Sequence, residues 1–412
     1  MRPTTVVAAK AFAKDEQFQE HAHLLQNYRR APVTFVRGEG CELIDDHGVR
    51  YLDFMAGIAV CALGHAHPVI TEAITKQAAI LVQASNLYYH EPAGTLANEL
   101  ARRSGLERVF FCNSGSEANE AAIKLARKLA FRKGETERRT ILACRHSFHG
   151  RTFGALAATD NPAYHEGFEP LPGGFAFTPF NDIAALETAL DARVAAFIVE
   201  PIQGESGVRP ADPAFLAAAR RLCSERGALL IYDEIQCGMG RLGPLFAFES
   251  FGVKPDVVTM AKALANGLPI GAVLISEAAA KGLQRGDHGT TFGGSPVPCA
   301  AGLAHLKLRD ELDLEKHVGE VAAVFWSGLE SLARDFPQAF APPRGRGLML
   351  GLPVRPPFQA KAFAEAARNE QHLLVNAAGD NTIRMVPPLI VTRQQAEDGL
   401  QRLRDAARSV LG

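Results

Sequence analysis

The stretch KPDVVTMAKA, residues 254–263, holds a short apolar run that is followed closely by a lysine. Val257, Val258 and Met260 are typical of a buried strand, and small residues follow them. Lys262 would then lie just past the strand end, where an ammonium group loses hydration unless it is paired or chemically used. A lone lysine of this kind is usually a solvated loop residue, so a chemical role needs support from the rest of the chain.

Strands and helices alternate on the N-terminal side of this stretch. The sequence predicts strands at residues 109–112, 196–199 and 228–232, and helices at 117–130 and 215–226. Nearly continuous apolar strands separated by helices are typical of a mostly parallel sheet that is covered on both faces. We therefore expect an α/β fold.

We expect three parts in the chain. An N-terminal segment, residues 1–62, packs with a small domain, and it contains a β-hairpin at residues 38–53 with a turn signal in the middle. Residues 63–302 form a large domain with the mainly parallel sheet, and residues 303–412 form a smaller α+β domain. The Pro/Gly-rich residues 342–347 are expected to be a loop.

Composition and charge exclude several classes of protein. The chain has 412 residues, 47% hydrophobic, with a net charge of −1, so neither nucleic acid nor an anionic membrane is favoured as a partner. No apolar run approaches the roughly 18 residues of a membrane span, and the start MRPTTVVAAKAFAKDEQ lacks the apolar region of a signal peptide. Seven scattered cysteines without a CxxC pair indicate reduced thiols, and therefore a cytoplasmic protein.

A candidate anion site lies between the predicted strand at 109–112 and the following helix. The residues are Asn113, Ser114, Gly115 and Ser116. Gly115 allows close backbone approach, the two serines offer hydroxyls, and the first amides of the helix are unpaired donors at its positive end. This arrangement suits a phosphate. The lysine and spacing of a P-loop are missing, which disfavours a nucleoside triphosphate, and simple N-capping by serine remains an alternative.

Three further strand ends carry distinctive residues, and strand ends are where ligands gather in parallel sheets. Phe148 could stack on a planar ring, and Arg151 could bind a carboxylate. Asp233 ends an apolar strand and needs a cationic partner, such as a protonated ring nitrogen, unless it caps a helix or forms a salt bridge. Lys262 follows it after roughly 30 residues, which leaves room for one crossover. Together with the phosphate site, these residues indicate pyridoxal 5′-phosphate.

At these residues the sequence resembles the class III aminotransferases, enzymes of the pyridoxal-phosphate fold type I. The resemblance runs from about Tyr28 to the C-terminus. It rests on GHAHP (64–68), FFCNSGSEANEAAIKLAR (110–127), SFHGRT (147–152), VEPIQGESG (199–207), YDEIQCGMGRLG (232–243), AKALANGLPIGA (261–272), HGTTFGGSP (288–296) and IRMVPPL (383–389). It implies a fold type I transferase whose large domain binds the cofactor.

The resemblance also implies how the cofactor is held. Lys262 would form a Schiff base with it, and Asp233 would pair with its ring nitrogen. The phosphate, the two ring faces and the ring hydroxyl would have these partners: Gly115, Ser116 and Thr291 of the partner subunit for the phosphate, Phe148 and Ile235 for the faces, and Gln236 for the hydroxyl. The implied assembly is a homodimer with shared active sites.

Within the family, the resemblance is closest to the acetylornithine aminotransferases, which transfer the δ-amino group of N-acetylornithine to 2-oxoglutarate. It implies that Arg151 binds a substrate carboxylate, with Thr290 nearby. It also implies that Glu205 covers Arg384 for the amine donor and releases it for glutamate. Ile58 stands where ornithine aminotransferases carry a tyrosine, and an apolar residue suits an acylated α-nitrogen better.

Other functions remain open at this point. The donor could instead be succinylornithine, succinyl-diaminopimelate, ornithine or 4-aminobutyrate, and an aminomutase or racemase would need no external keto acid. His65, His67, His146 and His149 lack acidic or cysteine companions at ligand spacing, so we expect no metal site. No GxGxxG follows an early strand, which disfavours a nicotinamide dehydrogenase. A binding module without catalysis would leave Lys262 idle.

Overall fold

The structure is a computed structural model, and it describes residues 23–25 and 27–412. The expectation about the first residues, that they are no signal peptide, lies outside the described residues. Within the described part, no helix is both long enough and apolar enough to cross a membrane.

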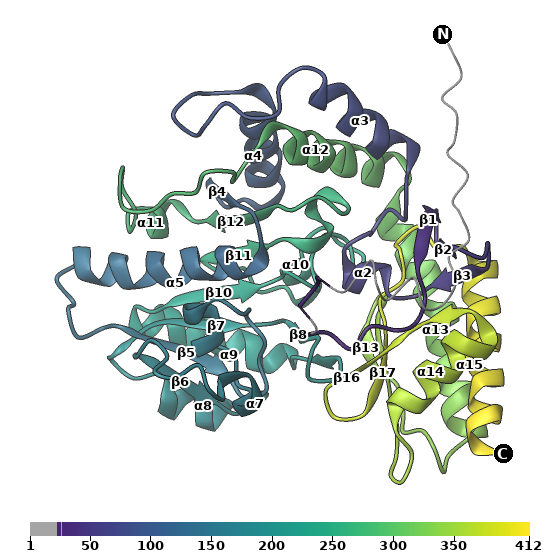
Figure 1. The fold of residues 1–412 in the computed structure, drawn as a ribbon. Helices are drawn as coiled ribbons and strands as arrows, with labels where there is room; N and C mark the ends of the chain where they lie inside the picture. Colours follow the sequence, from purple (N-terminus) through teal and green to yellow (C-terminus); the bar gives the residue numbers. More distant parts are fainter. Residues whose placement is uncertain (1–22, 26) are drawn as a thin grey trace.

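A sheet of seven strands lies at the centre of the described chain, in the order β4-β12-β11-β10-β7-β5-β6 (Figure 1). The bounds are β4 Arg108–Cys112, β5 Thr140–Cys144, β6 Phe175–Thr178, β7 Val194–Val199, β10 Leu229–Asp233, β11 Val257–Met260 and β12 Gly271–Ile275. β12 runs antiparallel to both of its neighbours, whereas the pairs among β11, β10, β7, β5 and β6 are parallel. The predicted mostly parallel sheet is confirmed.

Alternate side chains of the central strands pack into two separate cores, one on each face of the sheet. In β10, Ile231 packs with the apolar side of α5, while Leu230 and Tyr232 belong to the large core on the other face. This two-sided burial explains why the central strands are nearly continuously apolar. The helices of this part are α3 Pro68–Ala78, α4 Glu91–Ser104, α5 Gly115–Arg132, α6 Phe153–Ala157, α7 Pro162–His165, α8 Ile183–Ala189, α9 Pro213–Arg226, α10 Ala247–Phe251, α11 Glu277–Ala280 and α12 Pro296–Glu311.

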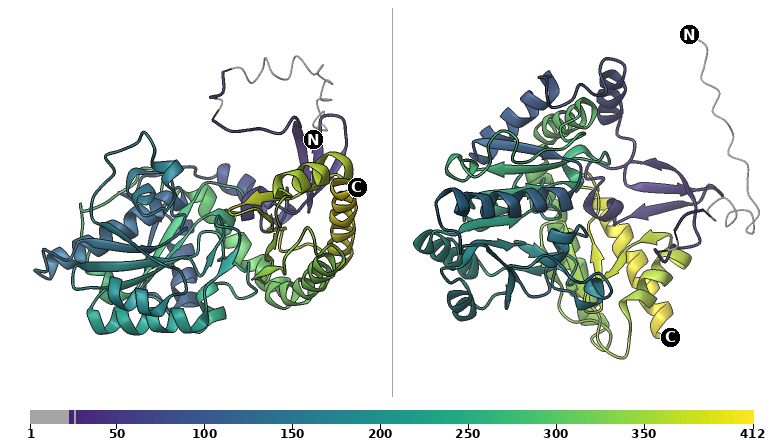
Figure 2. Two further views of the ribbon diagram at one scale, coloured as in Figure 1. Left: turned by 90° about the horizontal axis from the view of Figure 1, so that it is seen from below. Right: turned by 60° about the vertical axis from the view of Figure 1, so that its left-hand side comes forward.

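The two ends of the described chain lie side by side (Figure 2). The strands β1 Phe35–Glu39, β2 Glu42–Asp45 and β3 Arg50–Asp53 form the predicted antiparallel hairpin with one extra strand, and β15, Leu373–Leu374, joins β3 in parallel. The short turn α2, Ala56–Ala59, follows β3. This sheet therefore combines residues from both ends of the sequence.

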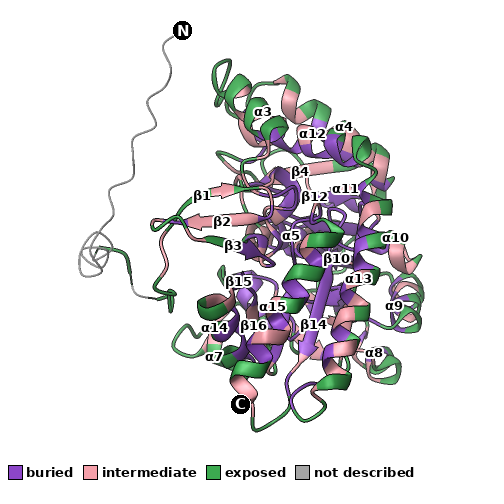
Figure 3. Cartoon of the chain, turned by 90° about the vertical axis from the view of Figure 1, so that its right-hand side faces the viewer, coloured by how far each residue is buried: buried purple, intermediate pink, exposed green. Residues whose placement is uncertain are grey.

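The C-terminal part contains another sheet, of four antiparallel strands, and three long helices, whose buried faces point inward (Figure 3). The elements are α13 Leu314–Asp335, β13 Arg344–Arg346, β14 Met349–Pro353, α14 Ala360–Gln371, β16 Asn376–Ala378, β17 Thr382–Met385 and α15 Arg393–Leu411. The prediction of a loop at 342–347 was wrong in part, because pairing with β14 makes β13 a strand. The expected domain boundaries after residues 62 and 302 stay predictions.

Candidate active site

The carboxyl ends of five central strands surround a cavity of about 310 Å³. The residues that follow β4, β5, β7, β10 and β11 all contribute side chains to its lining. This is the edge at which ligands gather in parallel sheets. The structure brings these sequence-predicted residues into the lining: Ser114, Gly115, Ser116, Phe148, Asp233, Ile235, Gln236 and Lys262.

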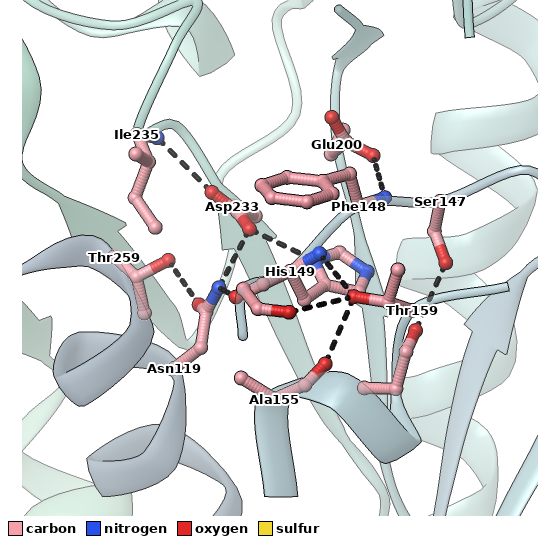
Figure 4. Close-up of polar contacts among 12 residues, drawn as sticks. Asn119, Ser147, Phe148, His149, Ala155, Thr159, Glu200, Asp233, Ile235 and Thr259 are labelled. Atoms are coloured by element: carbon pink, nitrogen blue, oxygen red, sulfur yellow. Dashed lines mark hydrogen bonds and ion pairs between the residues drawn. The ribbon is translucent and has the colours of Figure 1, made fainter. Parts of the chain in front are cut away.

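Asp233 is buried and its carboxylate is held by three contacts (Figure 4). Oδ2 accepts a hydrogen bond from Asn119 Nδ2 at 2.8 Å and lies 2.8 Å from Nδ1 of His149. Oδ1 accepts a hydrogen bond from the backbone N–H of Ile235 at 3.1 Å. Asn119 is held in turn, because its Oδ1 accepts a hydrogen bond from Thr259 at 2.8 Å. These contacts therefore hold the carboxylate of Asp233 in one orientation in the lining of the cavity.

The N-terminus of α5 forms the opposite end of the cavity. Ser114 caps the helix, since its Oγ accepts a hydrogen bond from the backbone N–H of Glu117 at 3.2 Å, so the N-capping alternative holds for this serine. Ser116 Oγ accepts a hydrogen bond from the backbone N–H of Arg151 at 3.1 Å. A Cβ at Gly115 would lie 2.8 Å from the side chain of Ile235, so glycine is required here for packing. Free amides at a helix N-terminus favour an anion.

Lys262 lies directly beyond β11, adjacent to the strand that carries Asp233, as the single crossover predicts. Its φ of +38° places a non-glycine residue in the left-handed region, which is uncommon and costly. Burial lowers the pKa of Lys262, although the charges of Glu205 and Asp233 oppose that change. A lysine with a lowered pKa has more of the neutral amine that a nucleophile or a base requires.

Glu205 and Arg384 form an ion pair at 2.5 Å that contacts the cavity through Gln236. Gln236 Nε2 donates to Glu205 at 3.0 Å, and Arg384 Nη1 donates to Gln236 Oε1 at 3.1 Å. Burial alone would raise the pKa of Glu205, but the Arg384 charge and hydrogen bonds outweigh it and lower that pKa. The structure therefore brings together the two residues predicted to exchange partners, and adds Gln236 to them.

Besides Glu205 and Arg384, three predicted residues are absent from the described lining of this cavity. Arg151 is exposed, and its guanidinium carbon lies 3.4 Å from the ring centre of Tyr164. Thr290 Oγ1 accepts a hydrogen bond from Asn113 at 3.0 Å, and Thr291 is exposed. The described lining of the cavity includes none of the three predicted residues. Their predicted roles stay predictions.

Sequence reasoning missed three polar residues of the site. Asn119 and His149 hold Asp233, and Glu200 lines the cavity beyond β7. Glu200 accepts a hydrogen bond from the backbone N–H of Phe148 at 2.9 Å. Burial, followed by the charge of Asp233, raises the pKa of Glu200. The signal that identified Asp233, a carboxylate at the end of an apolar strand, was present at Glu200 as well.

One segment next to the cavity wall has a strained backbone. The turn α2 contains four successive residues with positive φ: Ala56 at +48°, Gly57 at +64°, Ile58 at +66° and Ala59 at +61°. Each non-glycine residue in this region costs about 1–2 kcal/mol, and a β-branched one is a clear outlier. Val60, the next residue, lines the cavity. Such strain persists only where the surrounding structure imposes it.

The residues present fit pyridoxal phosphate. The helix terminus offers donors for a phosphate, Asp233 offers a carboxylate for a ring nitrogen, and Phe148 and Lys262 lie in the lining with them. Glycine is needed at position 150, because a Cβ there would lie only 2.2 Å from Ser116 Oγ and would displace that hydroxyl. Among the described residues, no group of three or more histidines, cysteines, aspartates or glutamates is arranged to hold a metal ion. Fold and site together define a pyridoxal-phosphate-dependent enzyme.

Comparison with known proteins identifies the family. Residues 24–407 match the family described as "Aminotransferase class-III". The chain therefore belongs to the class III aminotransferases, which depend on pyridoxal phosphate.

Individual relatives agree with this assignment. The chain is 47% identical to an acetylornithine aminotransferase of Methanocaldococcus jannaschii over 378 residues, which covers 92% of this chain and 94% of the relative. Among solved structures, an ornithine aminotransferase of Toxoplasma gondii has a TM-score of 0.94 at 31% identity, covering 100% of this chain and 99% of that one. An N-acetylornithine aminotransferase of Stenotrophomonas maltophilia has a TM-score of 0.83 at 38% identity, covering 96% and 99%.

Proposed function

We propose that this chain is an acetylornithine aminotransferase. It moves the δ-amino group of N-acetylornithine to 2-oxoglutarate and forms N-acetylglutamate semialdehyde and glutamate, a step of arginine biosynthesis. Curated relatives that bear this activity in their names support the donor, since they match more than nine-tenths of the chain. The observation that carries the proposal is the ion pair between partly exposed Glu205 and buried Arg384 beside the lysine cavity, because it suits a site that accepts two substrates of different charge.

When bound, pyridoxal phosphate supplies an electron sink for the carbon that loses a proton. Lys262 Nζ would hold the cofactor and then act as the base, because its lowered pKa leaves part of it as a neutral amine. Asp233 supplies a negative charge whose direction Asn119 and His149 fix. The α5 terminus would hold the phosphate, and the cofactor would lie against Phe148 and Ile235.

Arg384 and Arg151 would each bind one carboxylate of glutamate. The side chain of Arg384 is 1% exposed and that of Glu205 is 33% exposed, so Glu205 is the partner with room to move. With the acylated donor, Glu205 would stay on Arg384 and neutralise it. With glutamate or 2-oxoglutarate, the substrate carboxylate would replace Glu205 in a bidentate contact.

We also propose a homodimer with shared sites, in which Thr291 of the partner subunit contacts the phosphate. Large apolar side chains beside this residue support an interface: Leu87, Tyr88, Tyr89 and Phe292 are all exposed in the single chain. A cytoplasmic location is supported by the cysteines, since all seven are free thiols in the structure.

Ornithine is the second candidate donor, because the fold matches an ornithine aminotransferase with a TM-score of 0.94. Purified enzyme should be assayed with N-acetylornithine, N-succinylornithine, ornithine and 4-aminobutyrate against 2-oxoglutarate, with kcat/KM as the measure. We expect N-acetylornithine to be best by at least about 10-fold over ornithine, since an acyl group removes the charge of the α-nitrogen. A higher kcat/KM for ornithine would reject the proposed donor. Lys262→Ala is the control and should form no glutamate.

A further inference from the structure

The strained turn Ala56–Ala59 is anchored at its start by a single buried side chain. Asp53 ends β3 and is 1% exposed. Its Oδ1 accepts hydrogen bonds from the backbone N–H groups of Met55 at 2.8 Å and Ala56 at 2.9 Å. These two bonds fix the direction in which the chain enters the left-handed residues.

The second oxygen of Asp53 joins this anchor to the far end of the segment. Oδ2 lies 2.8 Å from Nε2 of His65, whose side chain is 14% exposed. Burial opposes a charge on this ring, but its bonds to Asp53 and Cys61 outweigh burial and raise the pKa of His65 to about 9. At neutral pH the pair is therefore a charged hydrogen bond, the stronger kind. Residues 53 and 65 are thereby joined across the turn.

Backbone bonds to the C-terminal part complete the support of this segment. Phe54 donates to the carbonyl of Leu374 at 3.0 Å, and Leu389 donates to the carbonyl of Ala62 at 2.6 Å. Asn266, four residues after Lys262, accepts from Leu63 at 2.7 Å and donates to Gly64 at 3.0 Å. The segment is thus fixed both to the C-terminal part of the chain and to the turn that begins with Lys262.

The strained turn borders two cavities. Val60 lines the cavity that holds Lys262, and Met55 lines a second cavity of about 1080 Å³. The second cavity also includes Asn376, whose Oδ1 accepts a hydrogen bond from Arg384 at 3.3 Å. A substrate that reaches from the lysine toward Arg384 would therefore lie along this turn.

We propose that Asp53 and His65 are positioning residues for the amino donor. They hold the strained turn in place, so that Val60, which follows the turn, keeps its position in the lining of the lysine cavity, beside the donor. Neither residue touches the reacting atoms; both act through the backbone of residues 55–60. This inference rests on the proposed function, because it assigns the turn to the donor of that reaction.

The test is steady-state kinetics of the holoenzyme with Asp53→Ala. We expect the KM for the amino donor to rise at least about 10-fold, because a small displacement of a substrate-positioning wall has large effects. The kcat should change less, and the absorption of bound cofactor and its amount per chain should stay as in the wild type. Asp53→Asn keeps an acceptor for the two N–H groups and should restore most of the donor affinity.

Asp45→Ala is the matched control. Asp45 is also buried, lies in the same sheet, and its Oδ1 accepts two backbone bonds, from His47 at 3.0 Å and Val49 at 2.8 Å. It caps a turn that lies outside the described lining of both cavities, so its loss should lower stability and leave the donor KM unchanged. An equal rise of KM in the two variants, or none in Asp53→Ala, overturns the proposal.

If Asp53→Ala yields no folded enzyme, His65→Gln replaces it, because this change leaves both cap bonds of Asp53 in place. We then expect a rise in donor KM by about 3-fold or more, and an unchanged KM overturns the proposal. All variants are compared on whichever donor the wild type uses best. Failure of N-acetylornithine in the wild type would therefore reject the proposed function without deciding the role of the turn.

Discussion

The two sides of the lysine cavity are built in different ways. On the side of the large sheet, Asp233 follows a regular buried strand and has a fixed set of hydrogen-bond partners. On the side of the two four-stranded sheets, the backbone after β3 turns through four left-handed residues, and Glu205 shares Arg384 of β17 with Gln236. One side has a carboxylate with fixed partners, and the other has the ion pair that we propose to exchange partners.

This difference matches what each side has to bind. A cofactor is the same molecule in every turnover, so saturated and rigid contacts serve it best. The two substrates differ in charge. A site for both needs an arginine whose charge is neutralised by a carboxylate of the protein when the substrate brings none. In the proposed exchange Glu205 would do this, since its side chain is partly exposed while that of Arg384 is fully buried.

The largest expected effect is on the rigid side. Asp233→Ala removes the charge that the ring nitrogen would face and leaves Asn119 and His149 without their acceptor. We expect kcat to fall by about 10²- to 10³-fold, as for the loss of other preorganised polar contacts. Thr259→Ala, which removes only the partner of Asn119, should cost less than about 10-fold. If kcat in Asp233→Ala stays within about 10-fold of the wild type, a rigid cofactor side is contradicted.

A smaller effect is expected on the exchangeable side. Arg384→Ala removes a charged partner of the substrate carboxylate, so the KM for the keto acid should rise by about 10- to 100-fold, corresponding to a charged hydrogen bond. Arg344→Ala is the control, because Arg344 lies in the same sheet but bonds to Gly207 and Thr382, whereas Arg384 bonds to Glu205 and Gln236. Equal KM values in the two variants would refute the assignment of Arg384.

A third effect concerns stability and its pH dependence, and not activity. The pKa of His65 is raised to about 9 in the folded chain, from 6.5. Because the folded chain binds the proton of His65 more tightly than the unfolded chain does, protonation of His65 stabilises the fold. This contribution is complete below pH 6.5 and is lost as the pH rises through 9. Between those values the free energy of unfolding should fall by about 3 kcal/mol more in the wild type than in His65→Gln. Denaturant unfolding at about pH 6.5 and 9.5 measures this, and parallel pH dependence in both proteins would contradict it.

The pattern of strands predicted the residues of the rigid side far better than it predicted the strained turn. Lys262, Asp233 and Gly115 each follow an apolar strand, so the strand pattern places them at one edge of the sheet. The strained turn gave no such signal, because alanine and isoleucine are not residues that favour left-handed backbone. Its conformation comes from contacts with Leu374 and with Asp53, which depend on the folded chain.

Two other features could not be predicted from the sequence, the strand at residues 344–346 and the role of Asn119, because both depend on contacts between distant parts of the chain. Residues 344–346 form a strand only because β14 lies beside them, and no local pattern predicts a three-residue strand. Asn119 was missed because it lies on a helix face that alanine and leucine dominate, and its purpose is visible only once Asp233 is beside it.

The pairing of β3 with β15 also bears on how the chain acquires its shape during synthesis. Leu52 and Asp53 find their strand partners, Leu373 and Leu374, roughly 320 residues later in the chain. At a ribosomal rate of about 5–20 residues per second, that partner emerges some tens of seconds after β3. The central sheet, which needs no residue beyond 275, can form in the interval. The strained turn would then be set last, against a scaffold that is already assembled.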